Sequence, residues 1–202
     1  MSTVRTGLSS AYVAVLALLL CAAAPARAQN GTFGIWHGGE LVGRVAVSRT
    51  VTGEHTHYAM NSLSSVVLFW SRVITTVCTS EYEGNTLVAC HTSVHVNGAV
   101  RDSSHLRTGH DGTRGYVHPG RTTLSPCTTP WSTTRMYYEE PVDQQSIYVE
   151  SVLHECPLVR TGDGTYRLTL PDNKVNHYVY RDGVLQEIRV DRSLFDLVFR
   201  RV

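Results

Sequence analysis

Residues 74–98 read ITTVCTSEYEGNTLVACHTSVHVNG, two runs of alternating apolar and polar residues joined by Gly84-Asn85. Alternation with a period of two places the two sets of side chains on opposite faces of a β-strand. A short Gly-containing sequence between two such runs is typical of a tight antiparallel turn. We therefore predict a hairpin with one buried face and one face in water.

The same pattern extends along most of the chain. Residues 41–51 alternate in the same way, and sequences that favour turns recur beyond them. These are Gly38-Gly39, Asn97-Gly98, Asp111-Gly112, Asp163-Gly164, Pro171-Asp172-Asn173 and Asp182-Gly183. We predict an all-β domain built on one curved antiparallel meander sheet of about ten strands, rolled into an open half-barrel. A β-sandwich is the alternative. Residues 119–136, rich in Pro, Thr and Ser, predict a long connection with at most a short helix near Arg135.

The N-terminus has the features of a secretory signal peptide, residues 1–28. Arg5 precedes an uncharged apolar stretch, 11–24, that is too short for an ordinary membrane span. Ala26-Arg27-Ala28 then provides small residues at the positions before a cleavage site. We expect cleavage between Ala28 and Gln29, a single mature domain over 29–202, and export to the periplasm or the medium. No transmembrane segment is expected after processing.

Four cysteines follow the predicted signal peptide: Cys78, Cys90, Cys127 and Cys156. An even number in an exported chain favours disulfides, with three possible pairings. If the turn is centred on Gly84, Cys78 faces Cys90 across the hairpin, with Cβ atoms about 4.5–5.5 Å apart. A shift of one residue would place the thiols on opposite faces. We predict the disulfide Cys78–Cys90 and, by elimination, Cys127–Cys156.

Composition and motifs exclude several classes of function. The chain has a formal net charge of +1, and 42% of its residues are hydrophobic and 17% charged. Such a chain is not disordered, and its balanced charge does not favour a nucleic-acid partner. The mature sequence contains no Gly-x-Ser-x-Gly, His-Glu-x-x-His or Gly-x-Gly-x-x-Gly motif. We therefore assign no catalytic residue and expect no cofactor.

Histidines and paired glutamates are the remaining candidates for chemistry. His55 and His57 share one strand face, as do His91 and His95, but the spacing of the sequence marks no third ligand, and we expect no metal site. Glu139-Glu140 would point to opposite faces of a strand. A glycosidase-like pair would need a distant partner such as Glu150.

Several short motifs resemble those of a bacterial family of exported proteins known as domain of unknown function 6134. The resemblance runs from about Gly31 to Val202. It is carried by Asn30-Gly31-Thr32-Phe33, Glu40-Leu41-Val42-Gly43, Met136-Tyr137-Tyr138-Glu139-Glu140-Pro141, Pro171-Asp172-Asn173-Lys174 and Tyr178-Val179-Tyr180-Arg181-Asp182-Gly183. It implies a fold like the half-barrels of periplasmic lipoprotein carriers, and no established activity. The cysteines are not part of the family pattern.

Aromatic residues could either line the concave side of such a sheet or fill its core. They are Trp36, Phe69, Trp70, Trp131, Tyr137, Tyr138, Tyr178 and Tyr180. Two classes of function follow. The first is a non-enzymatic binding module that holds an apolar or lipid-like ligand or docks a protein of the cell envelope. The second is a secreted hydrolase that uses carboxylates or histidines. The absence of a nucleophile motif favours the first.

Overall fold

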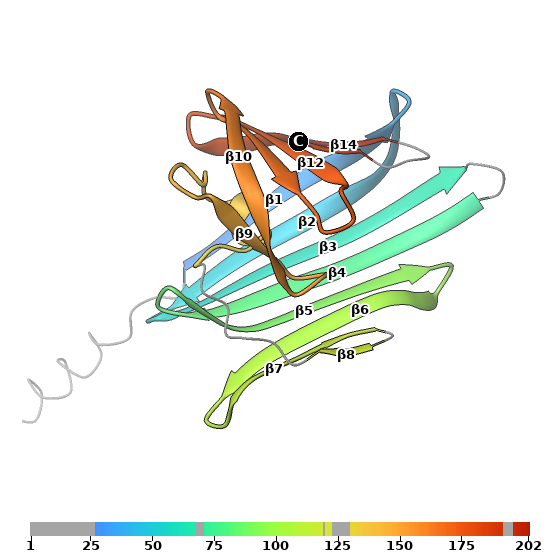
Figure 1. Ribbon diagram of the computed structural model, residues 1–202. Helices are drawn as coiled ribbons and strands as arrows, with labels where there is room; N and C mark the ends of the chain where they lie inside the picture. The colour runs from blue at the N-terminus through green and yellow to red at the C-terminus, as the bar shows by residue number, and fades with distance from the viewer. Residues whose placement is uncertain (1–26, 68–70, 119, 123–129, 192–195) are drawn as a thin grey trace, which may run out of the picture.

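The computed structural model describes residues 27–67, 71–118, 120–122, 130–191 and 196–202. Most of the predicted signal peptide lies outside these residues, and the first strand begins at Arg27 (Figure 1). No helix among the described residues is long and apolar enough to cross a bilayer.

Within the described residues, fourteen antiparallel strands form one sheet in the order β8-β7-β6-β5-β4-β3-β2-β1-β14-β13-β12-β11-β10-β9. Consecutive strands are neighbours except β8 and β9, which lie at opposite ends of the sheet. The first and last strands of the chain, β1 and β14, pair in the middle of the sheet. The bounds are β1 Arg27–His37, β2 Glu40–Thr52, β3 His55–Val67, β4 Ser71–Glu83, β5 Thr86–Val96, β6 Ala99–Gly109, β7 Gly112–Val117, β8 Gly120–Thr122, β9 Ser146–Val149, β10 His154–Gly162, β11 Thr165–Thr169, β12 Val175–Arg181, β13 Val184–Val190 and β14 Leu197–Arg201. One short 3-10 helix, η1, spans Arg135–Tyr137.

The predicted fold class is confirmed, with more strands than expected. The structure is a single meander and not a pair of stacked sheets, and β8 and β9 stay unpaired with one another at its two ends. The additional strands are short, such as β8 within the Pro/Thr/Ser-rich connection and β9 at the opposite end. Strands of three or four residues are too short to show a period of two in the sequence.

The sheet rolls so that β9, the last strand in the order given above, lies over the half of the sheet that contains β1–β8 (Figure 1). Tyr148 at β9 and Leu153 beyond it pack in one buried cluster with Leu87 and Leu106 of β5 and β6. A second cluster joins β1 and β2 to β10–β13. The roll therefore buries the inner face of both halves without joining the two end strands.

The register of the β4–β5 hairpin differs from the prediction, and the difference removes the expected cysteine pair. The turn consists of two residues, so Glu83 pairs with Thr86. The pairing then shifts between Glu81 and Tyr82, because Val88 is an extra residue on β5. As a result Cys78 lies opposite Thr92 and not opposite Cys90.

The predicted Cys78–Cys90 disulfide is therefore wrong for this structure. Residues related by such a diagonal lie about 7–8 Å apart, with Cβ atoms somewhat closer, whereas a disulfide needs Cβ atoms about 3.5–4.5 Å apart. Cys78, Cys90 and Cys156 are buried thiols. Cys127 lies outside the described residues, and so does the predicted pairing Cys127–Cys156.

The aromatic rings fill the inside of the roll. Trp131, Tyr178 and Tyr180 are buried, and Tyr137 and Tyr138 pack against the buried clusters. Trp36 is partly buried on the outer side, next to Gly34, while Phe69 and Trp70 lie outside the described residues. The described rings thus belong mainly to a filled core and do not line an open apolar cavity.

Candidate functional site

A segment without strands, residues 130–145, lies inside the roll and is called the inner segment below. It contains η1 and connects to β9. Tyr137 packs edge-on against Phe33 of β1, with ring centroids 5.3 Å apart, and Tyr138 packs against Tyr58 of β3 at 5.8 Å. The hydroxyl of Tyr180 donates a hydrogen bond of 2.7 Å to the carbonyl oxygen of Met136. The inner segment thus covers the inner face of the sheet with its own side chains.

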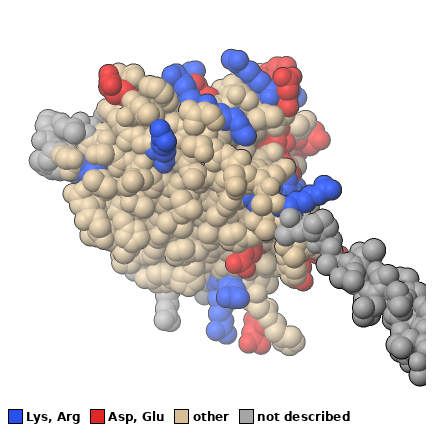
Figure 2. Space-filling view, turned by 180° about the vertical axis from the view of Figure 1, so that it is seen from behind, with Lys and Arg blue, Asp and Glu red and all other residues tan. Residues whose placement is uncertain are grey.

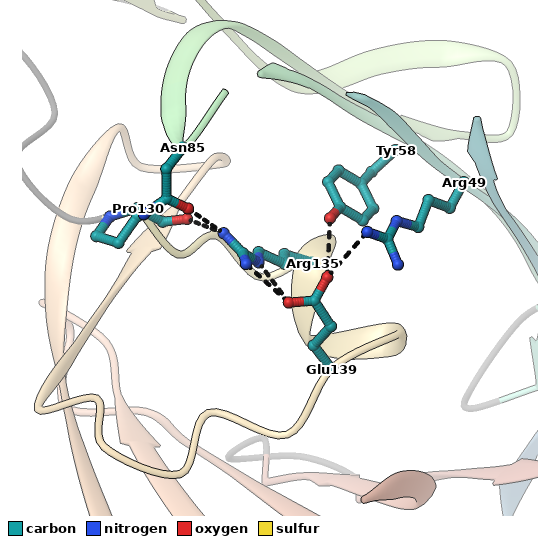
Figure 3. A network of polar contacts seen from close by, with 6 residues as sticks. All are labelled: Arg49, Tyr58, Asn85, Pro130, Arg135 and Glu139. Carbon is teal, nitrogen blue, oxygen red and sulfur yellow. Dashed lines mark hydrogen bonds and ion pairs between the residues drawn. The ribbon is translucent and has the colours of Figure 1, made fainter. Parts of the chain in front are cut away.

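Glu139 is the centre of a polar network that holds this segment to the sheet (Figure 3). Arg135 donates to its Oε2 from Nε at 3.0 Å and from Nη2 at 2.7 Å. The hydroxyl of Tyr58 donates to Oε1 at 3.3 Å, and Arg49 Nη2 lies 3.2 Å from the same oxygen. Both carboxylate oxygens are therefore occupied by cationic or phenolic groups of β2, β3 and η1.

Arg135 links the network to the β4–β5 turn. Its Nη1 donates to Asn85 Oδ1 at 2.8 Å and to the Pro130 carbonyl at 2.9 Å (Figure 3). Its guanidinium also lies 4.5 Å from the centre of the Trp131 ring, a cation–π contact. The planar fork of arginine makes these contacts at the same time.

A second carboxylate, Glu150, lies fully buried in the turn between β9 and β10. Its Oε1 accepts from Ser80 Oγ at 2.9 Å, from the Thr134 amide at 3.0 Å and from Thr134 Oγ1 at 2.8 Å. Its Oε2 accepts from the amide and the hydroxyl of Thr133. Ser104 Oγ donates to its backbone carbonyl at 2.6 Å. Hydroxyl and amide donors from β4 and the inner segment thus replace water around this buried carboxylate, and β6 holds the backbone of Glu150.

The arrangement of the carboxylates does not favour acid–base catalysis. The sequence analysis placed Glu139-Glu140 on a strand, whereas in the structure the pair follows η1 in the inner segment. Glu140 accepts a hydrogen bond of 2.7 Å from the Tyr166 hydroxyl. Glu139 and Glu150 each have their own donors, and Glu150 is fully buried, so they do not form the exposed pair that a glycosidase needs.

Burial changes the titration of the groups around the inner segment. Burial, and then the charge of Glu139, raise the pKa of Tyr58. Burial, followed by the hydrogen bond to Glu140, raises the pKa of Tyr166 to about 12. Burial also raises the pKa of the Cys78 thiol well above its usual range and that of Cys156 to about 11. These groups stay neutral at physiological pH, which suits structural contacts and not proton transfer or thiolate chemistry.

The histidines singled out in the sequence lie on the other side of the sheet. His55, His57 and His91 are exposed, and His95 is partly buried, on the outer face of β3 and β5. Among the described residues, no group of three or more His, Cys, Asp or Glu side chains is placed to hold a metal ion.

The outer face of β2–β6 is uncharged over three successive rows of opposed residues. The rows are Ser48, Ala59, Thr79, His91 and His105; Ala46, Asn61, Val77, Ser93 and Ser103; and Arg44, Leu63, Thr75, His95 and Val100. Arg44, at one corner, is the exception. Figure 2 looks onto this side and shows few Lys, Arg, Asp or Glu side chains, which gather toward the margins. We call these three rows the outer patch.

A model of the family described as Domain of unknown function (DUF6134) matches residues 33–202. The chain belongs to this family. The match confirms the resemblance seen in the sequence motifs, and it spans every strand of the DUF6134 domain described above except the start of β1.

The DUF6134 domain is also similar to a solved structure, the β-barrel-like protein of domain of unknown function DUF1849 from Brucella abortus. The TM-score is 0.51 at 10% identity, over 90% of this chain and 98% of that chain. At this identity the similarity shows the fold alone. No curated protein matches the chain.

Sequence reasoning did not find the Glu139 and Glu150 networks as they are. It named Glu150 only as the distant partner that a glycosidase-like pair would need. In the structure each glutamate has its own donors instead: Arg135, Arg49 and Tyr58 at Glu139, and Ser80, Thr133 and Thr134 at Glu150. The available signal was the run Trp131-Ser132-Thr133-Thr134-Arg135, which collects hydroxyls and a guanidinium in one loop. What this signal could not show is which carboxylate the loop surrounds.

Proposed function

We propose that this domain is a non-catalytic binding module of the cell envelope that docks a protein partner through the outer patch. The observation that carries the proposal is the contrast between the two faces of the sheet. The inner face is filled by the chain itself, whereas the outer patch has Arg44 as its one charged residue and leaves Leu63 and Val100 exposed by 58% and 55%. Leu63 and Val100 lie in one row of this face, with Thr75 and His95 between them. Exposed apolar surface on one face is a feature of interaction sites.

The character of the patch favours a protein over other partners. Depletion of charge is a property of the centres of protein–protein interfaces. Anionic membranes and nucleic acids instead require clusters of Lys and Arg, and the outer patch contains Arg44 alone. The partner we infer therefore presents an uncharged surface of mixed apolar and hydroxyl-bearing side chains.

An apolar or lipid-like ligand inside the roll is the second candidate. It has less support, because Trp131, Met136 and the other core side chains occupy that space. The alternative of a secreted hydrolase has the least support, because Glu139 and Glu150 are already engaged by structural donors.

Site-specific photo-cross-linking in the producing cells tests the docking proposal. A photoreactive residue at Asn61 or Ser93, within the patch, should form a discrete protein adduct that is lost when Leu63→Asp is added. The matched control is the same residue at Val159, which is 43% exposed on β10. Equal cross-linking at Val159, or adducts that survive Leu63→Asp in a folded protein, would overturn the proposal. A lipid found by native mass spectrometry, without such an adduct, would support the second candidate instead.

A further inference from the structure

Strands β5 and β6 place two imidazoles directly opposite each other on the outer face of the sheet. His91 pairs with His105 in the register of these strands, and both side chains are exposed. They come from different strands, so their sequence spacing does not suggest a shared site. Neither histidine is part of the Glu139 or Glu150 network.

Strand geometry makes this pair more suitable for a shared ion than either same-strand pair in the sequence. Directly opposed residues have Cβ atoms about 4.5–5.5 Å apart. His55 and His57, two residues apart on β3, are separated by about 7 Å, and His91 and His95 by about 14 Å. Imidazole nitrogens bind a metal at about 2.0–2.1 Å, so two rings on one ion need closely spaced backbone positions.

The neighbours of the pair are an aromatic ring, a hydroxyl and charged side chains of both signs. The ring of His105 packs against Tyr116 of β7, with centroids 5.5 Å apart and planes 33° from parallel, which restricts its rotation. Thr79 lies opposite His91 on β4, and Glu81 lies diagonally from it. Arg107 is two residues from His105 on β6, and Arg114 lies opposite Arg107 on β7.

We propose that His91 and His105 form a two-imidazole site for a divalent transition-metal ion, with water in the remaining positions. Imidazole ligands suit Cu²⁺, Ni²⁺ and Zn²⁺, and Cu²⁺ binds most tightly to a given nitrogen site. This inference goes beyond the docking function. The site lies in the outer patch, where its open positions face the surface on which we place the partner.

Titration of the folded protein with Cu²⁺ alone tests the proposal. Electron paramagnetic resonance should show one tightly bound ion with nitrogen ligands, and calorimetry should give one equivalent. His91→Ala and His105→Ala should each weaken binding by at least about tenfold, the lower end of what loss of a supporting group alone costs a metal site. His57→Ala and His95→Ala are matched controls, because they remove a histidine from the same face without touching the pair.

Circular dichroism verifies that each variant is folded. Equal loss of affinity in all four variants would show adventitious surface binding and overturn the proposal. Unchanged affinity in His91→Ala and His105→Ala, or no saturable binding to the unmodified protein, would also overturn it. Because the titration contains no partner, its outcome is independent of the cross-linking test.

Discussion

Cys78 and Cys90 lie diagonally across the β4–β5 hairpin, because Cys78 is opposite Thr92 and Cys90 is opposite Ser80. Cys78 Sγ lies 3.3 Å from Thr92 Oγ1, a hydrogen bond between buried side chains. The two thiols therefore share the inner face of the sheet without being bonded to each other.

Cys78 should be inert in the folded protein. Burial, and then the charge of Glu150, raise the pKa of its thiol well above the usual range, which disfavours the reactive thiolate in the folded protein. We expect iodoacetamide to modify Cys78 in urea but not under native conditions, as measured by mass spectrometry of peptides. A Cys78–Cys90 peptide recovered without reduction would contradict the observed register.

Glu150→Gln should destabilise the domain strongly. The NH₂ group of the glutamine would face hydrogen-bond donors, such as the amide and hydroxyl of Thr134, and could not accept from them. Each buried donor left without an acceptor costs about 1–3 kcal/mol of stability. We expect the free energy of unfolding in urea to fall by about 2–4 kcal/mol, since more than one donor is affected. Glu83→Gln, at an exposed end of β4, is the control and should change it by less than about 0.5 kcal/mol.

Arg135→Lys should loosen the inner segment while keeping its charge. A lysine cannot donate to both Glu139 Oε2 and Asn85 while stacking on Trp131. We expect a loss of about 1–3 kcal/mol in unfolding free energy, measured in urea. Arg167→Lys, on an exposed position of β11, is the matched control. Equal stability of the two variants would mean that the Glu139 network does not hold the segment.

The domain should lose stability as the pH rises above 10. Burial and the hydrogen bond to Glu140 raise the pKa of Tyr166 to about 12 from 10.0. A group with a raised pKa in the folded state stabilises the fold fully below its unfolded pKa, and this contribution is lost as the pH rises through the folded value. The window for Tyr166 is therefore pH 10 to 12.

Phenolate absorbance recorded together with circular dichroism measures this effect. Ionisation of the buried tyrosines and loss of ellipticity should coincide. Tyr166→Phe should reduce the dependence of stability on pH in this window relative to the unmodified protein. Ionisation of all tyrosines near pH 10 without unfolding would contradict the burial that we describe.

Alternation of apolar and polar residues was enough to predict the class of fold. The period-two pattern of residues 74–98 reappears as β4 and β5, and the predicted helix near Arg135 is η1. Val88 shows where the pattern failed. It has the parity expected for the buried face, but it is the extra residue of the bulge. Leu87, which is 2% exposed, takes the buried position instead.

The amino-acid sequence alone thus determined the all-β meander and the family, because strand periodicity, turn residues and short motifs are local properties. The tertiary structure alone decided which residues face one another: Cys78 with Thr92, His91 with His105, and Glu150 with Ser80. The physical reason is that register depends on turn length and on bulges, which shift every cross-strand partner without changing the alternation. A rolled sheet also brings strands β4 and β6 onto the β9–β10 turn, a contact between residues too far apart in sequence for any local pattern to record.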